Sequence, residues 1–186
     1  LLNKPEYIEE AKKQFLIHIK YLFDKKTGLW FHGWTFEGNH NFAEALWGRG
    51  NSWVTIAIPE FLDLVELDEN DPVRQILIDT LDRQLEALET CQNENGLWHS
   101  LLLDLTSYVE ASCTAGFAFG TLRSVRKRYV GKRYNDMGLK AIKAVIENID
   151  ETGELQHVSA GTAMGETQEF YKQIPVTAMP YGQSMA

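Results

Sequence analysis

Three segments of the chain repeat one order of residues, and this repeat limits the possible folds more than any other feature. Each segment has a polar turn followed in order by a glycine, a leucine and a histidine: DKKTGLWFH (24–32), QNENGLWH (92–99) and DETGELQH (150–157). A second set of glycines recurs in step with the first, at Gly50, Gly116 and Gly182. Internal repeats of this kind are typical of architectures that stack or close one repeated unit.

The residues between these turns have the hydrophobic spacing of helices. Three stretches combine a charged face with an apolar face, as amphipathic helices do: 5–24, 71–91 and 134–149. Asp71 and Pro72 suit the N-cap and the first helical position of the second stretch. Two other stretches carry fewer charges and more small residues, which indicates helices buried on most sides: 52–67 and 110–125. No stretch has the alternating pattern of a long strand.

Each repeat therefore predicts an outer amphipathic helix, a Gly-Leu turn with a loop, and an inner buried helix. This is the pattern of an all-α fold, an α/α toroid in which helical hairpins close into a barrel. We count about three hairpins, and the third stops as its inner helix begins at YGQSMA. A closed toroid has more, so residues 1–186 are expected to form about half of one barrel domain. The N-termini of the inner helices would meet at one end, where their dipoles favour an anion.

Composition excludes several classes of function. The net charge is −8 and the isoelectric point is about 5.1. The basic stretch RSVRKRYVGKRY (123–134) is interpreted as a solvated helix end and loop, so no nucleic-acid partner is expected. No apolar run approaches the ~20 residues of a membrane span. Cys91 and Cys113 make no disulfide framework, which favours a reducing, cytoplasmic location.

The segment WGRGNSW (47–53) is the strongest candidate for a binding site. Arg49 is permanently charged and its planar guanidinium matches a carboxylate. Trp47 and Trp53 offer indole faces, on which the apolar face of a sugar ring packs. In a junction between loop and helix, both tryptophans would line one pocket with the arginine. The alternative is that both tryptophans belong to the core and that Arg49 caps a helix.

Histidine and glutamate side chains give weaker signals. His32 is followed by Gly-Trp and a long loop, so we favour it as a group that contacts substrate. His99 and His157 occupy the equivalent turns and are interpreted as structural, and His40 as an exposed loop residue. Glu44 and Glu110 precede the expected inner helices, where a carboxylate stabilises the helix dipole by about 0.3–1 kcal/mol. No metal-binding motif is present, and GTAMGET (161–167) is interpreted as a loop.

Several motifs in this order carry a resemblance to a known family: LWFHGW, WGRGNSW, EASCTAGFAFG, SAGTAMG and IPVTAMPYGQSMA. Together they resemble the unsaturated rhamnogalacturonyl hydrolases of glycoside hydrolase family 105, and more loosely the unsaturated glucuronyl hydrolases of family 88. The resemblance implies a barrel of six α/α hairpins that acts on oligosaccharides ending in a 4,5-unsaturated uronic acid, as in pectin degradation or glycosaminoglycan breakdown. It also implies that an aspartate protonates the alkene and then activates water, without a metal or organic cofactor.

The resemblance assigns residues in this chain to the sugar site. His32 matches the family histidine that reaches the unsaturated sugar, and Trp47, Arg49 and Trp53 match the pocket motif. Tyr181 and Gln183 match a C-terminal motif without an assigned role. The catalytic aspartate of the family precedes the helix that 5–24 matches, so this chain resembles the C-terminal half. Alone it is expected to be inactive, because Asp24, Asp63 and Asp104 are interpreted as turn or surface residues.

Three alternatives remain beside an unsaturated uronyl hydrolase. A non-catalytic uronate-binding module on the same scaffold would bind without turnover. A sugar epimerase on an α/α barrel would need paired histidines on inner helices, and none lies there. A helical scaffold for other proteins would leave WGRGNSW unexplained. The partner expected is a short unsaturated uronyl oligosaccharide, and an exposed half-barrel core would also favour self-association.

Overall fold

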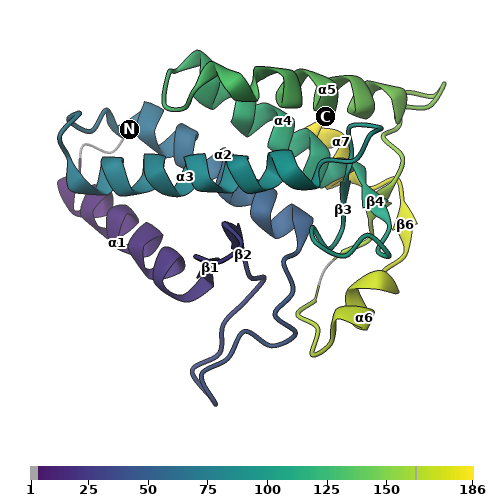
Figure 1. Cartoon of the computed structure of the whole chain (residues 1–186), viewed down its shortest axis with the longest axis horizontal. Coiled ribbons are helices and arrows are strands. Elements are labelled where there is room, and N and C mark those ends of the chain that lie inside the picture. Colours follow the sequence, from purple (N-terminus) through teal and green to yellow (C-terminus); the bar gives the residue numbers. More distant parts are fainter. Residues whose placement is uncertain (1–3, 162) are drawn as a thin grey trace.

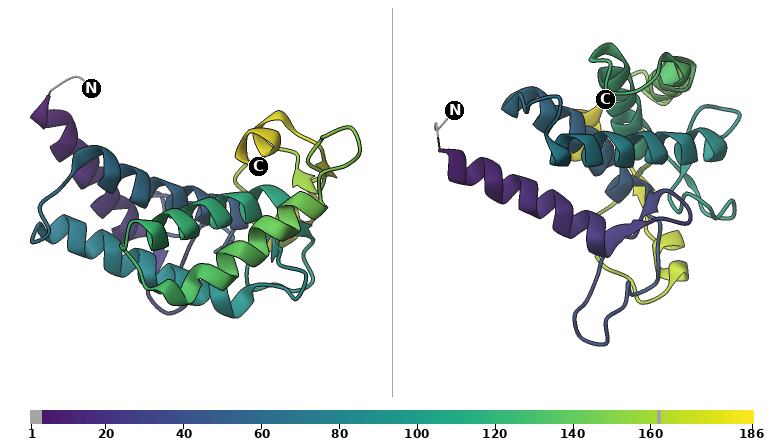
Figure 2. Two further views of the ribbon diagram at one scale, coloured as in Figure 1. Left: turned by 90° about the horizontal axis from the view of Figure 1, so that it is seen from above. Right: turned by 60° about the vertical axis from the view of Figure 1, so that its left-hand side comes forward.

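The computed structural model describes residues 4–161 and 163–186, and it is mostly helical (Figure 1). The long helices lie side by side in a curved array, and the two views of Figure 2 show that α1 and α5 lie at its opposite edges. The long helices are α1 (Pro5–Leu22), α2 (Gly48–Val65), α3 (Pro72–Cys91), α4 (Ala111–Arg126) and α5 (Asn135–Glu147). The prediction of alternating outer and inner helices is confirmed, because α4 has buried residues on most of its surface and α1 has none that are fully buried.

Short elements connect the long helices. Two-residue strands pair in three antiparallel hairpins: β1 (Phe23–Asp24) with β2 (Leu29–Trp30), β3 (Trp98–His99) with β4 (Val109–Glu110), and β5 (Val158–Ser159) with β6 (Val176–Thr177). A 3-10 turn, η1 (Lys132–Tyr134), precedes α5, and two short helices, α6 (Gln168–Lys172) and α7 (Pro180–Met185), follow β5. The helix α6 was not predicted, because it lies in a stretch without helical periodicity.

The Gly-Leu turns of the repeat adopt one conformation. Gly28, Gly96 and Gly153 have φ angles of +76°, +88° and +86°, in the left-handed region that glycine enters without steric cost. Two of these turns also pack closely on the next outer helix. A Cβ at Gly28 would lie 2.9 Å from the carbonyl oxygen of Arg83, and one at Gly96 would lie 2.7 Å from that of Lys140. Each repeated Gly-Leu segment is therefore a turn, and the turns at Gly28 and Gly96 also pack against the next outer helix.

The core lies where α4 packs against α2 and α5. Small residues let the helices approach, since a Cβ at Gly120 would lie only 2.3 Å from the carbonyl oxygen of Thr55. Around this contact lies a cluster that includes Leu81, Trp98 and Phe117, none of which is exposed. The buried inner helix predicted at 110–125 is thus explained by glycine and alanine at its contact face.

The ends of the predicted helices are mostly confirmed. The side chain of Asp71 accepts hydrogen bonds from the backbone N–H groups of Val73 and Arg74, as expected of the N-cap of α3. The exception is α2, which begins at Gly48 and not at residue 52. The segment WGRGNSW is therefore the first turns of a helix, and the prediction of a loop-to-helix junction across it is wrong.

Glu44 and Glu110, which precede the inner helices, have different positions in the structure. Glu110 is the N-cap of α4, and its side chain accepts a hydrogen bond from the backbone N–H of Cys113, so its predicted place at a helix N-terminus is confirmed. Glu44 is exposed, has a φ of +51°, and lies outside the first turn of α2 because the helix starts at Gly48. The expectation that the two glutamates share one role is therefore wrong.

The predictions for the cysteines, for membrane spans, for Asp24 and Asp104 and for residues 161–167 can be compared with the structure. The two cysteines are free thiols, and no helix in the described ranges has both the length and the apolarity needed to span a bilayer. Asp24 ends β1 and Asp104 lies in the loop between β3 and β4, and they accept hydrogen bonds from Thr27 and Thr106 of the adjacent turns. Of GTAMGET, residue 162 lies outside the described residues, and the others are irregular, as predicted.

Asp63 differs from its prediction as a turn or surface residue. It belongs to α2, and its side chain forms ion pairs with Arg123 and Lys127 at 2.6 and 3.0 Å and accepts a hydrogen bond from Tyr129. The inward orientation follows from the charged end of α4, which lies beside α2 and supplies both cations. Burial acts to raise the pKa of Asp63, but Tyr129, Lys127 and Arg123 together outweigh it, so the pKa is lowered overall.

Candidate functional site

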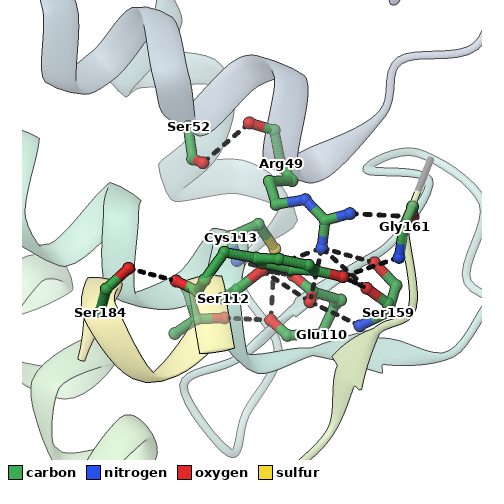
Figure 3. Close-up of polar contacts among 10 residues, drawn as sticks. Arg49, Ser52, Glu110, Ser112, Cys113, Ser159, Gly161 and Ser184 are labelled. Carbon is green, nitrogen blue, oxygen red and sulfur yellow. Dashed lines mark hydrogen bonds and ion pairs between the residues drawn. The ribbon is translucent and has the colours of Figure 1, made fainter. Parts of the chain in front are cut away.

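The N-terminal turns of α2, α4 and α7 meet around the side chain of Arg49 (Figure 3). Arg49 lies in the first turn of α2, Glu110 caps α4, and Tyr181 lies in the first turn of α7. The sequence analysis expected the N-termini of inner helices to meet at one end, and this expectation is confirmed. The group that occupies the meeting point is a cation from the chain itself.

The guanidinium of Arg49 binds other parts of the chain. Its Nη1 donates to the carbonyl oxygen and the hydroxyl of Ser159 at 3.0 and 2.8 Å, and to the hydroxyl of Ser112 at 3.3 Å. Its Nη2 donates to the carbonyl oxygen of Gly161 at 3.0 Å. The residue is 5% exposed. Arg49 therefore joins α2 to the β5 strand and to the segment that follows it.

Glu110 supplies a buried negative charge beside this guanidinium. Its carboxylate lies 3.6 Å from Nη1 of Arg49 and accepts hydrogen bonds from the hydroxyl of Ser112 and the backbone N–H groups of Cys113 and Ser159. A buried carboxylate is stable only with such partners. The sequence analysis assigned Glu110 to the helix dipole alone, and its pairing with Arg49 was missed because the two residues are far apart in the chain.

Aromatic rings enclose Arg49 on two sides. Its Cζ lies 4.8 Å from the centre of the Trp47 ring and 4.6 Å from that of Tyr181, within the range of cation–π attraction. The hydroxyl of Tyr181 donates to the carbonyl oxygen of Ser159 and accepts from the backbone N–H of Gly161. Tyr181 thus contacts two of the residues that Arg49 binds, Ser159 and Gly161, which gives the C-terminal motif a structural role.

His32 also packs on Trp47. The centres of the two rings lie 4.5 Å apart, and Nδ1 of His32 lies 2.6 Å from the hydroxyl of Tyr171 on α6. Burial and, to a lesser degree, the positive charge of Arg49 lower the pKa of His32 to about 4. The imidazole is therefore neutral at pH 7. His32, Trp47 and Arg49, all predicted for the site, form one contiguous cluster.

Trp53 lies elsewhere in the described structure. It is 48% exposed and lines an apolar groove between α1 and α2, together with Phe15, Trp30 and Val54. Trp47 precedes α2 as its N-cap, with an extended backbone, whereas Trp53 lies within the helix. The prediction that Trp47 and Trp53 line one pocket assumed a loop, and it fails in the described residues because α2 begins at Gly48.

Of the histidines interpreted as structural or as loop residues, His99 and His40 have the places predicted for them, whereas the side chain of His157 is exposed. Nδ1 of His99 hydrogen-bonds to the carbonyl oxygen of Ser107, and the residue is buried beside β4. His157 is exposed, and its carbonyl oxygen accepts from the backbone N–H of Ala111. His40 is exposed in the loop. Among the residues that the structure describes, no group of three or more His, Cys, Asp or Glu side chains is placed to hold a metal ion.

The model of Glycosyl Hydrolase Family 88 matches residues 1–186. The chain belongs to this family. Its relatives include Unsaturated rhamnogalacturonyl hydrolase YesR of Bacillus subtilis, which is 34% identical over 187 residues covering 100% of this chain and 52% of that protein. Unsaturated 3S-rhamnoglycuronyl hydrolase of an Alteromonas species is 30% identical over 84% of this chain and 39% of that protein. The predicted resemblance is confirmed.

Solved structures support the same family. A crystal structure from Klebsiella pneumoniae, described as a possible member of the GH105 family, matches with a TM-score of 0.98 and 58% identity. The match covers 100% of this chain and 49% of that one. The fold of these neighbours is the α/α toroid predicted from the repeat, of which this chain forms a part. The chain spans about half the length of the relatives it matches.

Proposed function

We propose that this chain forms part of a glycoside hydrolase that releases a terminal 4,5-unsaturated uronic acid from an oligosaccharide derived from pectin or a glycosaminoglycan. The observation that carries the proposal is the cluster of His32, Trp47 and Arg49, which combines a neutral imidazole, an indole face and a buried cation. These groups suit a sugar ring that carries a carboxylate. The family and the printed names of its relatives supply the class of substrate.

In the proposed reaction, the C4=C5 double bond is hydrated. An acid gives a proton to one alkene carbon, and water, activated by the conjugate base, adds its hydroxyl to the other. The hydrated sugar is unstable, its ring opens, and the next sugar leaves. No cofactor takes part. This sequence differs from ordinary glycoside hydrolysis, in which two carboxylates act at the anomeric carbon.

The four residues predicted to bind substrate are proposed to have different roles, because their surroundings differ: His32, Trp47, Arg49 and Trp53. His32 donates to the sugar, and Trp53 offers an exposed indole face for ring packing. Arg49 attracts the carboxylate through its charge and holds Trp47 and the Ser159 segment in place. The acid is proposed to be the aspartate that the family resemblance implies before α1, and Asp24, Asp63 and Asp104 of this chain have other partners. The proposed domain is one barrel, with this chain as its C-terminal half.

A uronate-binding module without chemistry is the alternative. It rests on the same cluster of His32, Trp47 and Arg49, which would bind a uronate without taking part in any reaction. Both functions predict binding of an unsaturated uronyl oligosaccharide, and neither predicts nucleic acid or membrane as a partner. The free thiols agree with the proposed cytoplasmic location.

Turnover in heavy water separates these functions. The full-length protein that contains this chain is incubated in D₂O with an unsaturated galacturonyl or glucuronyl disaccharide, and the products are followed by NMR. Hydration predicts loss of the alkene signal and one deuteron on a former alkene carbon of the uronic acid. Release of a uronic acid that keeps its double bond would contradict the mechanism. Binding without release would favour the module.

A further inference from the structure

The hydroxyl of Tyr171 is the hydrogen-bond partner of His32. Tyr171 belongs to α6 and is fully buried, and its oxygen lies 2.6 Å from Nδ1 of His32. The long loop that follows β2 and the segment that carries α6 extend from the same side of the helical array (Figures 1 and 2). The contact therefore holds these two segments together beside Trp47.

The other contacts of the Tyr171 hydroxyl decide the direction of this bond. Its oxygen accepts the backbone N–H of Gly165 at 3.2 Å, which leaves its single hydrogen to be donated. Two acceptors are within reach: Nδ1 of His32, and the sulfur of Met164 at 3.8 Å. A thioether sulfur is a weak acceptor, whereas a neutral imidazole nitrogen is a good one. Donation to Nδ1 is therefore the stronger of the two bonds open to this hydrogen, and we infer this direction for the contact.

We propose that Tyr171 is a positioning residue that fixes His32 in the tautomer with its proton on Nε2, so that His32 presents a neutral N–H donor to the uronic acid. The inference rests on the proposed function for the identity of the acceptor, but the tautomer itself depends only on the contact with Tyr171. In this role His32 binds the sugar and does not transfer a proton.

The surroundings of His32 agree with a neutral donor. Burial and the nearby Arg49 guanidinium, which is the charged group that acts on it, disfavour the imidazolium form. Within residues 4–161 and 163–186, Nε2 of His32 has no hydrogen-bond partner, and it is not among the fully buried polar atoms that lack one. This nitrogen is therefore not fully buried.

Two other histidines, His99 and His40, have contacts that fix whether Nδ1 carries a proton. Nδ1 of His99, at the equivalent turn, faces the carbonyl oxygen of Ser107, which can only accept a hydrogen bond. His99 therefore carries a proton on Nδ1. His40 is the opposite case. Its Nδ1 accepts a hydrogen bond from the backbone N–H of Phe42 at 3.0 Å, so this nitrogen carries no proton. Two histidines of the same chain thus serve as references for the two protonation states of Nδ1.

Nitrogen NMR of the histidine rings tests the tautomer directly. In the ¹⁵N-labelled full-length protein at pH 7, His32 should show a protonated Nε2 and an unprotonated Nδ1, as His40 does and as His99 does not. Tyr171→Phe should convert His32 to a mixture of tautomers and leave His99 unchanged. A protonated Nδ1 in wild-type His32, or an unchanged single tautomer in Tyr171→Phe, would overturn the inference.

Amide substitutions test the role in binding. The side-chain nitrogen of glutamine reaches the place of Nε2, and that of asparagine reaches the place of Nδ1. His32→Gln should keep KM within roughly fivefold of wild type, whereas His32→Asn should raise KM by roughly tenfold or more, as expected for loss of a hydrogen bond to a charged group. Equal effects of the two substitutions would contradict the inference. Absence of turnover in the wild type would contradict the proposed function, and the NMR result would still decide the tautomer.

Discussion

Nη1 of Arg49 and Oε1 of Glu110 lie 3.6 Å apart in the interior, where the two side chains are 6% and 1% exposed. The pair joins the first turn of α2 to the N-cap of α4, the two helices whose contact forms the centre of the core. Removal of one partner from a buried pair leaves the other charge without compensation, and this costs more than the pair itself contributes.

Arg49→Ala should therefore lower the free energy of unfolding by about 3–5 kcal/mol, because it leaves Glu110 buried and unpaired. The matched control is Asp79→Ala, which removes the partner of Arg83 in an exposed pair and should cost about 0–1 kcal/mol. Urea unfolding of both variants measures the difference. Similar midpoints for the two variants would show that the buried pair is not important for stability.

The hydroxyl of Tyr181 should contribute separately from its ring. Tyr181→Phe removes the hydrogen bonds to Ser159 and Gly161 but keeps the aromatic face over Arg49, so we expect a loss of about 1–3 kcal/mol. Tyr181→Leu removes both and should cost more, by about 0.5–2 kcal/mol. Thermal and urea unfolding of the two variants provide the test. A phenylalanine variant as unstable as the leucine variant would assign the whole effect to the hydroxyl.

The repeated glycines should differ in their tolerance of a side chain. Alanine at Gly28, Gly96 or Gly153 meets the strain of a positive φ, about 1–2 kcal/mol. At Gly28 and Gly96 the new Cβ would also meet a backbone oxygen, while at Gly153 nothing lies within 4 Å. Gly153→Ala should therefore be the least destabilising of the three in urea unfolding. A larger loss at Gly153 than at Gly96 would contradict the packing described for these turns.

Acidification should weaken the fold through His32. Its pKa is about 4 in the folded chain and 6.5 in the absence of such perturbation. Between these values the unfolded chain takes up a proton that the folded chain does not. The stability that neutral His32 contributes to the folded chain is therefore complete above pH 6.5 and is lost as the pH falls toward 4. His32→Gln should reduce the slope of unfolding free energy against pH in this window. A slope that His32→Gln leaves unchanged would contradict this prediction.

The repeat and the helical periodicity were sufficient to predict the arrangement of the fold. The Gly-Leu turns, the Asp71 cap and the buried character of 110–125 depend on local chemistry, and all three are confirmed. The start of α2 was missed because Gly48 and Gly50 disfavour a helix by about 1 kcal/mol each relative to alanine. Burial of this turn against Cys113 and the His99 backbone outweighs that preference.

The candidate site was only partly predictable. His32, Trp47 and Arg49 were found from their motifs, and the structure places them together. Glu110, Ser159 and Tyr171 were not assigned to the site, because each reaches it from a distant segment by tertiary contact. The short α6 has no hydrophobic periodicity that would indicate it. A histidine in the first repeat whose partner lies in the third is not visible from spacing alone.

The loss of alkene absorbance tests the central claim most directly. The full-length protein is mixed with an unsaturated galacturonyl disaccharide, and the ultraviolet absorbance of the conjugated double bond is followed for wild type, His32→Ala and Phe36→Ala. Phe36 is an exposed aromatic residue in the loop after β2 and serves as the control. We predict a steady loss for wild type and Phe36→Ala, and a rate at least roughly tenfold lower for His32→Ala. No loss with the galacturonyl or the glucuronyl substrate, or equal rates for all three proteins, would contradict the account.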